Sequence, residues 1–367
     1  MRIPHLLRSL AMPLALLLLL AGCATPYRPA VVVRDSTPFP GVAGIAAANG
    51  TRPVDLILVH GMCTQDADWA ERSIDRIAGA VATHAPGAPL APGADGGIQV
   101  IERTQQLAGG TVRFHALLWS PLTVPLKRQL DYDKTAQPTD CGADQVCKPV
   151  RAVLNGMVKD RLLDDCLADA VIYEGASHAP LRDAMVETVS RIVAANPDPD
   201  GTLVVVAESL GSKMLFDALS SMLESTQPRT QALGQLAARR LGLIYMAGNQ
   251  LPILGLAEQG LVASAVPAQD ALQRFLALRR RQPTQRAGRL QRLAVVAFTD
   301  PNDLLSYRLL PARYAASDVA VADVLVSNAR TWLGLLENPV AAHMHYLANP
   351  DVGAMIACGF PRMAGCR

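Results

Sequence analysis

The sequence predicts an α/β fold with a mostly parallel central sheet and helices on both faces. Near-continuous apolar runs alternate along the chain with segments in which apolar residues recur every three or four positions. Runs without polar interruption are typical of strands that are buried on both faces of a parallel sheet. The expected strands are residues 54–59, 111–118, 202–207, 241–247 and 293–298.

The segments between these runs have helical periodicity. Leu181, Met185 and Val189 recur on one face of the helix expected before residues 202–207. A second amphipathic helix is expected directly after that strand, with Met214 and Leu219 on its apolar face. Regular alternation of strands and helices indicates a sheet that is covered on both sides.

Composition supports a large folded domain and excludes some classes of partner. Half of the 367 residues are apolar and 18% are charged, which is incompatible with a mainly disordered chain. The 34 Lys and Arg against 32 Asp and Glu give a net charge of +2. Without Arg2 and Arg8, which lie in a segment expected to be removed, the balance is 32 against 32. A neutral chain provides no field for nucleic acid, so no nucleic-acid partner is expected.

The first 22 residues have the features of an export signal. Arg2 and Arg8 precede a short apolar run, which ends in Leu20-Ala21-Gly22-Cys23. This ending resembles the bacterial lipobox, which implies removal of residues 1–22 and acylation of Cys23. The resemblance places the protein in the bacterial envelope, lipid-anchored on the periplasmic side. Because Ala24 is not aspartate, the outer membrane is favoured. An ordinary signal peptide with an accidental cysteine is the alternative.

Six cysteines remain besides Cys23. Export would expose them to an oxidising compartment, where an even number of cysteines suits disulfides. The simplest pairs are the local ones, and they leave one long-range pair. Zinc binding is the rival use, but no Cys-x-x-Cys motif is present. The expected pairs are Cys141 with Cys147, Cys358 with Cys366, and Cys63 with Cys166.

The chain is expected to divide into three parts. Residues 1–22 are the lipoprotein signal peptide, residues 23–53 a Pro-rich tether, and residues 54–367 a single α/β domain. Within that domain, residues 120–177 are too long for an ordinary connection. They are expected to form an insertion, either as a lid over a site or as a purely structural excursion.

Ser209 has the surroundings of a nucleophilic serine. The expected strand 202–207 runs into Ala207-Glu208-Ser209-Leu210-Gly211, and an amphipathic helix follows at once. A strand–serine–helix turn flanked by small residues is typical of a nucleophile elbow. Ala207 stands where the motif usually has its first glycine. A plain turn serine is the alternative interpretation.

A second motif, His60-Gly61-Met62, follows the expected strand 54–59. With the Ser209 motif, it resembles the α/β-hydrolase superfamily of lipase- and esterase-like serine hydrolases. That resemblance implies an oxyanion hole made by the backbone N–H groups of Met62 and Leu210, with Cys63 as a possible substitute for Met62. His60 is interpreted as a buried residue that orients this loop and not as the catalytic base.

The superfamily order of serine, acid and histidine narrows the choice of partners for Ser209. Only His343 and His345 follow the serine. His343 is favoured because, with Tyr346, it matches the His-x-x-Tyr spacing of similar proteins. A metal site at these two histidines is not favoured, because no companion ligand motif accompanies them.

The acid is expected after the strand 293–298, where two aspartates occur. Asp303 is favoured because it precedes an apolar pair, at the position where family members usually have the acid. Its rival, Asp300, precedes Pro301 and is interpreted as a helix N-cap.

The resemblance therefore implies a serine hydrolase that cleaves carboxylic esters through an acyl-enzyme intermediate. The expected substrate is a small-molecule or lipid ester, and neither a cofactor nor a metal is expected. The alternative is a non-catalytic envelope lipoprotein of similar fold that binds a ligand or partner. The sequence contains no indication of the oligomeric state.

Overall fold

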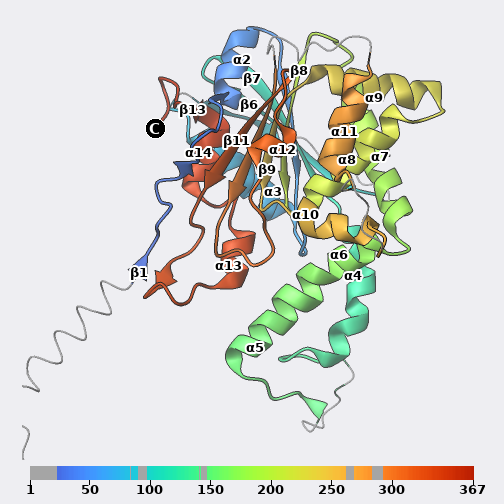
Figure 1. Cartoon of the computed structure of the whole chain (residues 1–367), viewed down its shortest axis with the longest axis vertical. Coiled ribbons are helices and arrows are strands. Elements are labelled where there is room, and N and C mark those ends of the chain that lie inside the picture. The colour runs from blue at the N-terminus through green and yellow to red at the C-terminus, as the bar shows by residue number, and fades with distance from the viewer. Residues whose placement is uncertain are drawn as a thin grey trace, which may run out of the picture.

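The computed structural model describes residues 23–82, 84–89, 97–139, 141, 147–261, 268–282 and 292–367. Nine strands of this part form one sheet through the middle of the molecule (Figure 1). The strands from β11 to β7 are all parallel, and β2, β6 and β5 are antiparallel to their neighbours. In order across the sheet they are β2 (Val31–Val32), β11 (Val319–Leu325), β10 (Leu293–Thr299), β9 (Leu241–Ala247), β8 (Thr202–Glu208), β4 (Val54–Val59), β7 (Gly110–Leu118), β6 (Gln99–Leu107) and β5 (His84–Pro89).

The α/β class and the mostly parallel sheet are confirmed. The five expected strands correspond to β4, β7, β8, β9 and β10, with ends that differ by no more than one residue. Two long strands were not expected. In β6 many residues are only partly buried, so it lacks an apolar run. In β11 an apolar run is present but is interrupted by Asp323.

Successive residues of the central strands point into two separate apolar cores, as strand geometry requires. Ile57 and Val205 belong to the first core, whereas Leu56 and Val204 belong to the second. The first core is covered by α7 (His178–Ala195), α8 (Leu210–Leu223), α9 (Pro228–Arg240) and α11 (Ala271–Arg280). The second is covered by α2 (Val42–Asn49), α3 (Ala67–Gly79) and α14 (Pro350–Cys358).

The expectation of a tether at residues 23–53 is wrong, because this segment belongs to the folded domain. Strand β2 pairs with β11, and β3 (Phe39–Pro40) pairs with β13 (Gly359–Phe360). The helix α2 buries Val42 and Ile45 in the second core. Its apolar residues are stabilised only when they leave water, and this explains why the segment folds onto the sheet.

The expected insertion is a helical excursion that projects from the sheet body, at the bottom of Figure 1. It comprises α4 (Ser120–Lys127), the 3₁₀ segment η1 (Arg128–Asp133), α5 (Val153–Met157), the π-helical η3 (Val158–Leu167) and α6 (Ala168–Glu174). Shorter elements elsewhere are β1 (Cys23–Ala24), α10 (Leu251–Leu254), η4 (Gly255–Glu258), α12 (Pro311–Tyr314), β12 (Thr331–Trp332) and α13 (Pro339–Met344). Within the described ranges, no helix is both long enough and apolar enough to cross a membrane.

Three disulfides join the cysteines in the pairs expected from the sequence, namely Cys63–Cys166, Cys141–Cys147 and Cys358–Cys366. Cys23 is a free cysteine.

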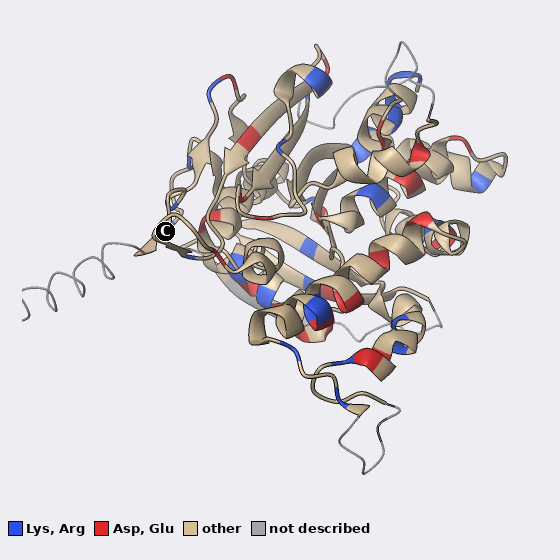
Figure 2. Cartoon of the chain, turned by 60° about the horizontal axis from the view of Figure 1, so that its bottom comes forward, with Lys and Arg blue, Asp and Glu red and all other residues tan. Residues whose placement is uncertain are grey.

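Basic and acidic residues are interspersed along the ribbon in the view of Figure 2.

Candidate active site

Ser209 lies in a strained turn at the carboxyl end of β8, between that strand and α8. Its φ of 50° and ψ of −126° fall in a region that residues with a side chain rarely adopt. The N–H of Ser209 donates a 2.7 Å hydrogen bond to the carbonyl of Ala247, at the end of the neighbouring strand β9. The turn is thereby held against the sheet edge with the serine side chain at its apex.

Two glycines allow the loop after β4 to pack directly on this turn. A Cβ at Gly61 would lie 2.7 Å from the Cβ of Ser209. A Cβ at Gly211 would collide with the carbonyl oxygen of His60. The requirement for small residues that the two sequence motifs suggested therefore has a steric basis.

Ser209, His343 and Asp303 form one hydrogen-bonded series of buried side chains. The Oγ of Ser209 lies 3.2 Å from Nε2 of His343, and Nδ1 of His343 lies 2.9 Å from both carboxylate oxygens of Asp303. Because a carboxylate only accepts, Nδ1 carries the proton and Nε2 is left to accept one from the serine hydroxyl. This arrangement suits the removal of a proton from Ser209.

The elements around the two partners hold them in place. His343 lies on α13, whose N-cap Asn338 accepts the N–H groups of Val340 and Ala341 through its side chain. Asp303 lies in the loop after β10 and accepts hydrogen bonds of 2.9 Å from the hydroxyl of Tyr346 and 3.0 Å from the N–H of Leu305.

The carboxyl group of Asp303 is held in its charged form. Burial opposes ionisation, but the hydrogen bond and charge of His343, with the hydrogen bonds from Leu305 and Tyr346, keep the pKa of Asp303 below its ordinary value. A charged Asp303 can fix the orientation of His343 and stabilise its protonated form.

The two rival residues lie outside this series. His345 follows α13 and is exposed. Asp300 is buried, and its carboxylate accepts the N–H groups of Asn302 and Asn328. The expected helix after Asp300 is absent, because residues 300–305 form turns, so Asp300 caps a turn instead of a helix.

The backbone N–H groups of Leu210 and Met62, which the sequence led us to expect as oxyanion donors, are not engaged elsewhere in the part of the chain that the structure describes. Leu210 is the first residue of α8, so its N–H lacks an acceptor within the helix. The N–H of Met62 has no hydrogen-bond partner among the described residues. Cys63 does not fit the role of substitute donor, because its N–H donates a 2.9 Å hydrogen bond to Asp169.

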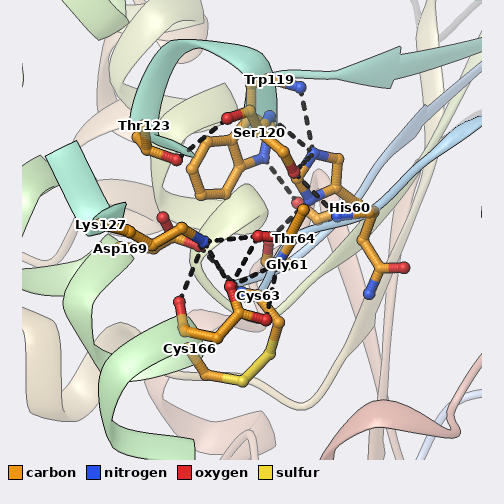
Figure 3. A network of polar contacts seen from close by, with 12 residues as sticks. His60, Gly61, Cys63, Thr64, Trp119, Ser120, Thr123, Lys127, Cys166 and Asp169 are labelled. Carbon is orange, nitrogen blue, oxygen red and sulfur yellow. Dashed lines mark hydrogen bonds and ion pairs between the residues drawn. A yellow bond between two sulfur atoms is a disulfide. The ribbon is translucent and has the colours of Figure 1, made fainter. Parts of the chain in front are cut away.

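The loop of residues 61–64, here termed the oxyanion loop, is clamped to the insertion (Figure 3). The disulfide Cys63–Cys166 joins it to η3. Thr64 donates a 2.6 Å hydrogen bond to Asp165 through its hydroxyl. Lys127 lies 2.6 Å from Asp165 and 3.0 Å from Asp169 and donates to the Thr64 hydroxyl. No local sequence pattern marks these charged residues, and only the expected long-range cysteine pair indicated a link between the two regions.

His60 supports the oxyanion loop from its other side. Its ring stacks on Trp119 with a centroid distance of 4.6 Å. Nδ1 donates to the carbonyl of Gly61, while Nε2 accepts the N–H of Trp119 at 3.0 Å. Burial lowers the pKa of His60 to about 3, so the ring is neutral at physiological pH. Nδ1 therefore holds the loop, and Nε2 ties it to the start of α4.

Glu208, the residue before Ser209, is a buried carboxyl group that the sequence analysis did not single out. Burial raises its pKa to about 7, although the hydrogen bond from the indole of Trp69 and the charge of His343 oppose the rise. A strongly shifted group beside a candidate nucleophile is typical of active sites.

A cavity of about 440 Å³ lies against the insertion, and Ser209, His343 and Asp303 do not line it. Thr64, Lys127 and Met344, the residue after His343, contribute to its lining. Its volume suits a small-molecule ligand. The described part of the chain contains no group of three or more His, Cys, Asp or Glu residues that could hold a metal ion.

Comparison with protein-family models, with curated proteins and with solved structures gives no match to this chain. The functional interpretation therefore depends on the geometry of the site itself.

Proposed function

We propose that this chain is a serine hydrolase of the α/β-hydrolase type that cleaves carboxylic esters. The observation that carries the proposal is the buried series Ser209–His343–Asp303, with Ser209 at a positive φ between a central strand and a helix. A serine that merely shapes a turn has no need of an imidazole backed by a carboxylate.

In the proposed acylation step, Nε2 of His343 accepts the hydroxyl proton as Ser209 Oγ attacks the acyl carbon. The carbonyl oxygen gains negative charge, which the N–H groups of Leu210 and Met62 stabilise. Collapse of this intermediate breaks the ester bond, and the protonated His343 gives its proton to the departing alkoxide. Asp303 stabilises the imidazolium throughout.

Deacylation repeats the same chemistry with water as the nucleophile. His343 accepts a proton from water, the hydroxide portion adds to the acyl carbon, and the carboxylic acid leaves as Ser209 recovers its proton. No cofactor takes part in this scheme.

The proposed location follows from the lipobox-like ending at Cys23. We propose that Cys23 is acylated and anchors the protein to a bacterial envelope membrane on the periplasmic side, with the outer membrane favoured. The proposed substrates are small-molecule or lipid esters that reach the site from that compartment.

Covalent labelling with a fluorophosphonate probe, with hydrolysis of short- and long-chain p-nitrophenyl esters, tests the proposed activity. The wild-type protein should be labelled and active, whereas Ser209→Ala should lose both properties. Ser221→Ala, a change on the same helix, serves as the matched control and should retain both. A folded wild-type protein with neither property would refute the proposal and favour the non-catalytic lipoprotein.

A further inference from the structure

The tight turn of residues 332–336, here termed the apolar turn, exposes four large apolar side chains. Their exposed fractions are 57% for Trp332, 56% for Leu333, 80% for Leu335 and 71% for Leu336. A contiguous exposed cluster of this kind is costly in water and marks an interaction surface.

The backbone of the apolar turn holds these side chains away from the domain. The N–H of Trp332 donates a 2.7 Å hydrogen bond to the carbonyl of Leu336, and the N–H of Leu335 donates a 2.9 Å bond to the carbonyl of Trp332. Leu333 and Gly334 both have positive φ values, of 54° and 66°. The exposure therefore follows from a hydrogen-bonded turn.

The apolar turn lies beside the residue proposed to carry the lipid anchor. In the antiparallel pair of β1 and β12, Cys23 is opposite Trp332 and Ala24 is opposite Thr331. The hydroxyl of Thr331 donates a further 2.9 Å hydrogen bond to the carbonyl of Ala24. Figure 1 shows β1 near α13, at the margin of the domain.

We propose that the apolar turn inserts into the surface of a lipid bilayer, next to the acyl chains on Cys23. This inference rests on the proposed anchor. Because β1 is paired with β12, acyl chains on Cys23 bring the bilayer surface to within reach of Trp332. Tryptophan favours the boundary between lipid and water, and the exposed Arg330 beside it can pair with lipid phosphates.

Docking of this turn has a consequence for the site. The turn is followed by Asn338, which caps α13, and α13 carries His343. A bilayer that binds residues 332–336 would therefore contact a segment that ends two residues before the N-cap of α13. Such docking would suit an ester that is drawn from a lipid layer.

Tryptophan fluorescence on tethered protein provides a direct test, because only one of the three tryptophans is exposed. Trp69 is 7% exposed and Trp119 is fully buried. The chain from Cys23 onward is coupled through its free thiol to a maleimide-headgroup lipid in phosphatidylcholine–phosphatidylglycerol vesicles, which makes the test independent of natural acylation. Phospholipids with bromine on the acyl chains then quench any tryptophan that they contact.

The wild-type emission should shift to the blue and be quenched, and Trp332→Phe should lose the quenched component. Leu335→Asp with Leu336→Asp should reduce the quenching, whereas Leu261→Asp, on another exposed surface, should leave it unchanged. Tethered wild-type protein with no more quenching than Trp332→Phe would overturn the docking proposal. The alternative is that the turn is buried in a dimer. Self-association in sedimentation that Trp332→Phe weakens, together with the absence of quenching, would overturn the docking proposal in favour of a second copy of the chain.

Failure of the anchor would be detected separately. Mass spectrometry of the native protein should show acyl chains on Cys23, and an unmodified Cys23 would refute the anchor whatever the quenching result. Unquenched Trp332 on protein with an acylated Cys23 would refute the docking alone.

Discussion

The amino and carboxyl ends of the parallel strands, here termed the two edges of the sheet, each bury a carboxyl group. The electrostatic surroundings of these two groups are opposite. Asp55, near the start of β4, makes an ion pair with Arg240 and a 2.7 Å pair with Arg113, and it accepts a 2.8 Å hydrogen bond from Asn196. Burial opposes its ionisation, but His115, Asn196 and the two arginines hold the pKa of Asp55 well below its ordinary range.

Glu208, at the end of the adjacent strand β8, accepts hydrogen bonds from the indole of Trp69 and the N–H of Leu347 and lies near His343, but burial outweighs these interactions and raises its pKa to about 7. One edge of the sheet, here termed the neutralised edge, compensates the charge of its buried carboxylate with two arginines and thereby stabilises the fold. The other edge, here termed the reactive edge, keeps in Glu208 a carboxyl group that can change its protonation state near neutral pH, which suits the proposed catalytic role of Ser209.

The largest expected effect is at the reactive edge. His343→Ala should lower kcat by at least about 10³-fold, because the serine loses its base. His345→Ala should leave kcat within about threefold, since its exposed ring lies outside the hydrogen-bonded series and surface changes are usually mild. Ester hydrolysis by both folded variants measures the difference. The reverse ranking would move the base to position 345.

The second effect concerns the neutralised edge and is a loss of stability. Asp55→Asn should lower the free energy of unfolding by about 3–5 kcal/mol at pH 7, because Arg240 is left buried without its counter-charge. Asp75→Asn, which removes the charge of an exposed carboxylate paired with Arg103, should cost less than about 1 kcal/mol. Urea titration with intact disulfides measures both values.

The pH dependence follows from the lowered pKa of Asp55. The stability that this carboxylate contributes is present above its ordinary pKa of 3.8 and is lost as the pH falls through its lower pKa in the folded protein.

Folded Asp55→Asn should retain wild-type kcat. A drop comparable to that of His343→Ala would show that the two edges are not separate in function.

The third effect tests the clamp on the oxyanion loop. Asp169→Ala should lower kcat by about 10- to 100-fold with little change in KM, because the loop loses its hydrogen bond from Cys63 to Asp169. Complete loss of an oxyanion donor costs about 10²- to 10³-fold in kcat, and displacement of the loop should weaken the proposed Met62 donor only in part. Asp169→Asn should restore most of kcat, since its amide oxygen can still accept the N–H of Cys63. Equal losses of kcat in both variants would contradict a positioning role for that hydrogen bond.

The last effect is a change in stability at Glu208 that appears only as the pH rises. Its pKa rises from an ordinary 4.5 to about 7 on folding, so the folded state binds more protons and the wild-type protein loses stability as the pH rises between these values. Glu208→Gln should therefore be more stable than wild type by about 3 kcal/mol above pH 7, with the gain absent below pH 4.5. Glu224→Gln, an exposed site paired with Arg274, should show no such trend. A gain that does not vary with pH would contradict this account.

The sequence by itself determined the central strands, the turn at Ser209 and the choice of candidate partners for that serine. These features are local. An apolar run of six or seven residues identifies a buried strand, as in β4 and β8, and a serine between such a strand and a helix has few alternatives. The His343–Tyr346 spacing and the position of Asp303 were likewise readable over a few residues.

Only the tertiary structure decided the contacts between distant segments. It folded residues 23–53 onto the sheet, engaged the N–H of Cys63 with Asp169, and brought Cys23 beside Trp332. Lys127 and Asp169 look like ordinary solvated charges in the sequence, because nothing local shows that they are buried together. Local patterns specify which elements form, whereas partners more than a hundred residues apart are selected by the packing of the whole chain.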